Sequence, residues 1–73
     1  MHSVRGVVNA AQEGRFRLVA DDGRVLLFVL SRNAAAEPQD LSRLQAERAR
    51  IRVDYDDGGH LIAAVARRID IEE

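Results

Sequence analysis

Apolar and polar residues alternate along most of this chain, which is the pattern of strands that bury one face. Short turn signals rich in aspartate and glycine, such as Asp21-Asp22-Gly23, separate the apolar runs. Both residue types favour tight hairpin turns because they tolerate the backbone conformations that such turns need. The pattern predicts five strands, at Val4–Asn9, Arg15–Ala20, Arg24–Ser31, Arg48–Tyr55 and His60–Ile71.

Alternation also assigns the strand faces, because successive side chains of a strand point to opposite sides. In the second predicted strand Phe16 and Leu18 share the inner face, which leaves Arg15 and Arg17 outside. The fourth strand shows the cleanest alternation. Its inner face carries Ala49, Ile51, Val53 and Tyr55, and its outer face carries three arginines, Arg48, Arg50 and Arg52. We expect these arginines to form a second basic stripe.

The third predicted strand is apolar on both faces. If Phe28 points inward together with Leu26 and Leu30, the opposite face carries an apolar stripe of Val25, Leu27 and Val29. A run of this kind belongs either to a strand covered on both sides or to one with an exposed apolar face.

A short helix is expected between the third and fourth strands. Pro38 suits a first helical turn, and Asp40 could instead cap a shorter helix that starts at Leu41. Leu41 and Leu44 are spaced to meet on one helical face. Three meandering strands, a short helix and a final hairpin predict an all-β, five-stranded OB-fold-like barrel that occupies residues 1–73 as a single domain.

Composition narrows the class of protein further. The chain has 73 residues, no cysteine and a formal net charge of −1, with 47% hydrophobic and 32% charged residues. These values are typical of one folded domain without disulfides or thiolate metal sites. No apolar run reaches the roughly 18 residues of a membrane span, and no secretion signal opens the chain, so we expect a cytoplasmic protein without membrane contact. All eleven basic side chains are arginine.

The order of these motifs resembles the cold-shock domain, a five-stranded OB barrel that binds single-stranded RNA and DNA. Gly14-Arg15-Phe16-Arg17-Leu18 lies where that family has Gly-Tyr-Gly-Phe-Ile, and Leu26-Leu27-Phe28-Val29-Leu30-Ser31 follows its Val-Phe-Val-His-Phe-Ser strand. The resemblance runs from about Val4 to Ile71. It implies a nucleic-acid-binding face on the second and third strands. The exposed aromatics of the family are replaced here by Arg15, Arg17, Leu27 and Val29.

A more distant resemblance is to bacterial translation initiation factor one, which reads a ribosomal RNA surface with basic residues more than with stacked bases. It is carried by Gly6-Val7-Val8, Phe16-Arg17-Leu18 and Asp22-Gly23.

The leading functional hypothesis is weak binding of RNA or single-stranded DNA. A guanidinium group can contact phosphate in two places and can stack on a base, so arginine can partly replace the missing aromatics. The expected nucleic-acid-binding residues are Arg5, Arg15, Arg17, Arg24, Leu27 and Val29. The alternative is a protein-interaction module, monomeric or a weak homodimer, whose contact surface is the stripe of Val25, Leu27 and Val29.

Catalysis and metal binding have little support in the sequence. The histidines, His2 and His60, lack carboxylates at metal-ligand spacing. The serines lie in no glycine-elbow motif, and the paired aspartates are those of turns. We expect a non-enzymatic protein with no cofactor and no metal.

Overall fold

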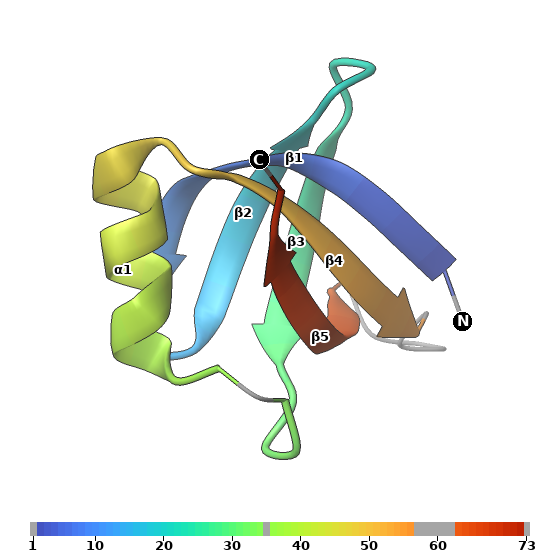
Figure 1. The fold of residues 1–73 in the computed structure, drawn as a ribbon. Coiled ribbons are helices and arrows are strands. Elements are labelled where there is room, and N and C mark those ends of the chain that lie inside the picture. Colours follow the sequence, from blue (N-terminus) through green and yellow to red (C-terminus); the bar gives the residue numbers. More distant parts are fainter. Residues whose placement is uncertain (1, 35, 57–62, 73) are drawn as a thin grey trace.

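The computed structural model describes residues 2–34, 36–56 and 63–72. It contains five strands and one helix, coloured in chain order in Figure 1. The elements are β1 (His2–Gln12), β2 (Arg15–Ala20), β3 (Val25–Leu30), α1 (Pro38–Glu47), β4 (Arg50–Asp56) and β5 (Ala64–Ile71).

The strands form a closed barrel in the order β1-β2-β3-β5-β4, and β1 pairs with β4 to complete it. Among the described pairings, β3 and β5 run parallel and the other four are antiparallel. The helix stands between β3 and β4 in the chain, as expected. The prediction of an all-β, five-stranded barrel with one short helix between the third and fourth strands is confirmed.

The barrel interior is filled by the residues that alternation places on the inner strand faces. Phe28 lies at its centre, with ring centroids 5.1 Å from both Phe16 and Tyr55. Phe28 stacks on Phe16 and meets Tyr55 edge-on, two arrangements that aromatic rings prefer. The buried apolar residues are Val4, Val8, Phe16, Leu18, Ala20, Phe28, Leu41, Leu44, Ile51, Val53 and Ala66.

Strand β1 is longer than predicted and contains an irregularity. Its pairing with β2 shifts register between Val8 and Ala10, which is the mark of a β-bulge at Asn9. A bulge inserts one extra residue, so the alternation read from Val4–Asn9 does not continue past it. Earlier in the strand, a Cβ on Gly6 would lie 2.1 Å from the carbonyl oxygen of Val19. Glycine at this position therefore allows β1 and β2 to approach closely.

Helix α1 begins at the earlier of the two predicted starts. Glu37 is the N-cap and Pro38 the first helical residue, while the Glu37 backbone N–H donates to Asp40 Oδ2 at 3.0 Å. Asp40 thus completes a capping box inside the first turn and does not cap a shorter helix. As expected, Leu41 and Leu44 are both buried, and they attach the helix to the barrel core.

The fourth and fifth strands start later than predicted, and β3 is one residue shorter at each end than the predicted Arg24–Ser31. Arg48 is not part of the fourth strand, because it ends α1 in a left-handed conformation (φ 52°) and β4 starts at Arg50. Strand β5 begins at Ala64, and the first part of the predicted strand His60–Ile71 lies outside the described residues. Within the described part of the chain, no helix is long and apolar enough to cross a membrane.

Candidate nucleic-acid interface

The outer surface of β2 and β3 brings together four of the six predicted binding residues. Cross-strand pairing places Arg15 opposite Val29 and Arg17 opposite Leu27. The next outward pair along the two strands is Val19 with Val25. We call the surface made by these six residues the β2–β3 face: Arg15, Arg17, Val19, Val25, Leu27 and Val29.

The β3 half of the β2–β3 face is apolar and accessible. Val25 is 58% exposed, Leu27 48% and Val29 37%, as expected if Phe28 points inward. Parallel pairing adds Val65 of β5 beside Val29, and Val19 adds a half-buried apolar neighbour on β2. Sequence reasoning missed both valines. Val19 could have been found, because it has the same strand parity as Arg15 and Arg17.

Arg15 and Arg17 are the positive charges of the β2–β3 face, and neither contacts a carboxylate among the described residues. Arg17 Nε donates a hydrogen bond to Asn9 Oδ1 at 2.9 Å. Asn9 is an amide, so this contact orients the guanidinium without neutralising it. Arg15 is exposed and has no polar side-chain partner in the described chain. Both guanidinium groups therefore retain their capacity to bind an anion.

A hollow of about 480 Å³ lies beside these arginines and reaches one residue of the apolar stripe, Leu27, together with Phe16 and Phe28 of the core. Arg15 and Arg17 contribute to its lining, as do Leu27, Gln12 and Ala63. Positive charge and apolar surface thus border one concavity, which suits a ligand that combines phosphates with flat bases.

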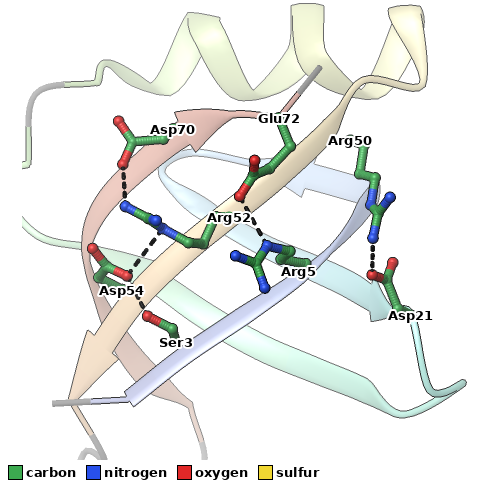
Figure 2. Close-up of polar contacts among 8 residues, drawn as sticks. All are labelled: Ser3, Arg5, Asp21, Arg50, Arg52, Asp54, Asp70 and Glu72. Atoms are coloured by element: carbon green, nitrogen blue, oxygen red, sulfur yellow. Dashed lines mark hydrogen bonds and ion pairs between the residues drawn. The ribbon is translucent and has the colours of Figure 1, made fainter.

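The other two predicted binding residues lie in different surroundings. Arg5 Nε forms an ion pair with Glu72 Oε1 at 2.9 Å, shown in Figure 2. Arg24 Nε contacts Asp22 Oδ2 at 2.7 Å. The backbone N–H of Arg24 also donates to Asp22 Oδ1 at 3.0 Å, and this hydrogen bond, helped by the guanidinium, lowers the pKa of the Asp22 carboxyl. Arg5 and Arg24 are thus already paired with acids.

Two arginines of the second predicted basic stripe, Arg50 and Arg52, are neutralised in the same way, whereas Arg48 ends α1 and contacts no carboxylate among the described residues. Arg50 pairs with Asp21, and Arg52 lies between two carboxylates, 3.1 Å from Asp70 and 3.5 Å from Asp54. Figure 2 shows these ion pairs together with the Arg5–Glu72 pair: the arginines come from β1 and β4, and the acids from β4, from β5 and from the residues that follow β2 and β5. This surface has little net positive charge to offer to a polyanion.

Arginines without a carboxylate partner are the minority in the described structure. Of the eleven arginines, seven contact a carboxylate, and the others are Arg15, Arg17, Arg32 and Arg48. Arg32 follows β3 and Arg48 ends α1, so they do not share a strand face. Arg15 and Arg17 lie on the same face of β2, about 6.6–6.8 Å apart along the strand. Within the described chain they are the one pair of arginines that share a strand face and contact no carboxylate.

The described residues contain no cluster of three or more His, Cys, Asp or Glu side chains that could hold a metal ion. His2 packs against Tyr55, with ring centroids 5.4 Å apart. His60 lies outside the described residues.

Comparison with known proteins adds no relative. No protein-family model, no curated protein and no solved structure matches this chain significantly. The resemblance to the cold-shock domain and to bacterial translation initiation factor one therefore stays a prediction drawn from the residues.

Proposed function

We propose that this chain is a small non-enzymatic OB-fold protein that binds RNA or single-stranded DNA weakly through the β2–β3 face. One observation carries the proposal: Arg15 and Arg17 lie on one strand and both line one hollow, and no carboxylate of the described chain neutralises them. Phosphate contacts from arginine supply most of the affinity in binding that does not depend on base sequence. Cytoplasmic residence is part of the same proposal.

Leu27 and Val29 act in this proposal as the surface on which bases rest. They stand directly opposite Arg17 and Arg15, so a strand whose phosphates contact β2 has its bases over β3. An aromatic platform contributes about 1–3 kcal/mol per stacked base. Aliphatic side chains present no π-face, so we expect lower affinity than that of an aromatic-rich OB barrel. The resemblance of the sequence to the cold-shock domain implies the same face.

Salt dependence measures how many phosphates the chain contacts. For single strands the slope of log affinity against log salt is about −0.7 per phosphate contact, so two contacts give roughly −1.4 and four give roughly −2.8. Because Arg5 and Arg24 are paired with Glu72 and Asp22, we expect the smaller slope. Titration of a labelled oligonucleotide at several salt concentrations gives this number.

A slope near −2.8 would show that Arg5 and Arg24 give up their carboxylates to bind phosphate, and would enlarge the site. Absence of binding at tens of micromolar protein in about 50 mM salt, where phosphate contacts are strong, would refute the proposed function.

A further inference from the structure

Asn9 belongs to none of the described strand pairings. The pairing of β1 with β2 passes from Val8 directly to Ala10, and the pairing of β1 with β4 ends at Val7. The extra residue of a β-bulge is left out of the ladder in this way, and a bulge often turns a side chain toward a new neighbour. The backbone carbonyl and the side chain of Asn9 can therefore both make contacts outside the ladder.

Helix α1 provides the partner of the Asn9 carbonyl. Gln45 Nε2 donates a hydrogen bond to the Asn9 backbone oxygen at 3.2 Å. The helix lies against β1 (Figure 1), and its buried residues Leu41 and Leu44 attach it to the barrel core. Gln45 directly follows Leu44, so the packing of α1 places Gln45 and, through it, the bulge at Asn9.

The side chain of Asn9 connects the bulge to β2. Ala10, which lies directly opposite Arg17, has a methyl group and cannot accept a hydrogen bond from it. Asn9 Oδ1 instead accepts from Arg17 Nε at 2.9 Å. This contact uses the Nε–H group and leaves both terminal nitrogens of the guanidinium for a phosphate. A long side chain that is already ordered loses less conformational entropy when it binds.

The amide group of Asn9 also preserves the positive charge of Arg17. A carboxylate at this position would form an ion pair with Arg17, like the pairs that Arg5 and Arg24 make with Glu72 and Asp22. A neutral acceptor orients the guanidinium and leaves its charge for a ligand.

We propose that Asn9 is a positioning residue of the β2–β3 face and that Gln45 holds it in place, so that α1 sets the orientation of Arg17 and with it the affinity for phosphate. The contacts run from α1 through the bulge at Asn9 to β2. The inference rests on the proposed nucleic-acid binding, because it assigns the residues that prepare Arg17 for that ligand.

The arginine Nε–H resonances of the chain without nucleic acid test the contact itself. In the wild type the Nε–H of Arg17 is expected to exchange with water more slowly than that of Arg15, which has no polar side-chain partner among the described residues. Asn9→Ala is expected to abolish this difference, and Gln45→Met to reduce it. The control Gln39→Met makes the same change in the first turn of α1 and is expected to leave the difference intact. Equal exchange at Arg15 and Arg17 in the wild type would overturn the inference.

Titration of a labelled oligonucleotide at several salt concentrations separates orientation from charge. Asn9→Ala keeps both arginine charges, so the salt slope is expected to stay unchanged while the affinity falls roughly two- to tenfold, the usual effect of having to order one long side chain on binding. Asn9→Asp neutralises Arg17, so the slope is expected to change from roughly −1.4 to roughly −0.7 and the affinity to fall further. Far-UV circular dichroism establishes that each variant is folded, and Gln45→Met decides the question if the Asn9 variants are not.

The results distinguish this inference from the proposed function. A wild-type chain that binds no oligonucleotide would refute the proposed function, and the role of Asn9 would fall with it. Wild-type binding whose affinity is unchanged in Asn9→Ala and in Gln45→Met would overturn the positioning role alone. An equal loss of salt slope in Asn9→Ala and Asn9→Asp would overturn it as well, because the amide would then not act through orientation.

Discussion

Replacement of Phe28 by alanine is expected to lower the free energy of unfolding by about 3–5 kcal/mol, the usual cost of removing a buried phenylalanine. Phe28 is 1% exposed and contacts the rings of Phe16 and Tyr55, so its loss leaves a cavity at the barrel centre. A domain of this length has a total stability of roughly 4–11 kcal/mol. Urea unfolding at low temperature is the measurement, because the variant retains little of that stability.

The control is Leu27, the residue before Phe28 on the same strand. Leu27→Ala removes an exposed side chain, so its cost is expected to be below about 1 kcal/mol. A large difference between the two variants tests the strand-face assignment on which the β2–β3 face depends. Equal losses at Phe28 and Leu27 would contradict that assignment.

Replacement of Arg15 and Arg17 together by glutamine is expected to weaken oligonucleotide binding at least tenfold at low salt and to remove most of the salt dependence. The reason is that each phosphate-binding residue that is lost lowers the salt slope by about one contact. Glutamine keeps the length and polarity of the side chain but not the charge. Fluorescence anisotropy at two salt concentrations gives both the affinity and the slope.

The matched control removes two positive charges elsewhere. Arg43→Gln with Arg48→Gln changes the net charge from −1 to −3, as the test variant does, but at α1 and its C-cap. We expect the control to keep nearly the wild-type affinity. If both double variants lose affinity equally, the attraction comes from overall charge and not from the β2–β3 face.

Much of the barrel could be predicted because the alternation of apolar and polar residues along each strand matches the burial of those residues in the structure. Alternation places Phe16 and Phe28 inside and leaves Arg15 and Leu27 outside. In a closed barrel the inward-facing residues fill the interior, so this division is also the stable one. Pro38 and the spacing of the two leucines predict α1 for a similar reason, since capping and packing are local to the segment. These features depend on residues near each other in the chain.

The state of each arginine could not be predicted in the same way. Arg5 meets Glu72, and Arg50 meets Asp21, only because strands distant in sequence become neighbours in the barrel. The bulge at Asn9 also escapes a period-two pattern, because it breaks that period. Asn9 then orients Arg17, so one residue of the candidate site becomes visible only in the structure.

Amide chemical-shift mapping with a short oligonucleotide is the most direct test of the central claim that the β2–β3 face binds nucleic acid. The expected changes cluster at Arg15, Arg17, Leu27 and Val29 and grow weaker as salt is added, while the amides around Arg5 and Glu72 stay unchanged. Changes concentrated at Arg5, Arg24 and Arg50, or an absence of changes at millimolar oligonucleotide, would contradict the claim.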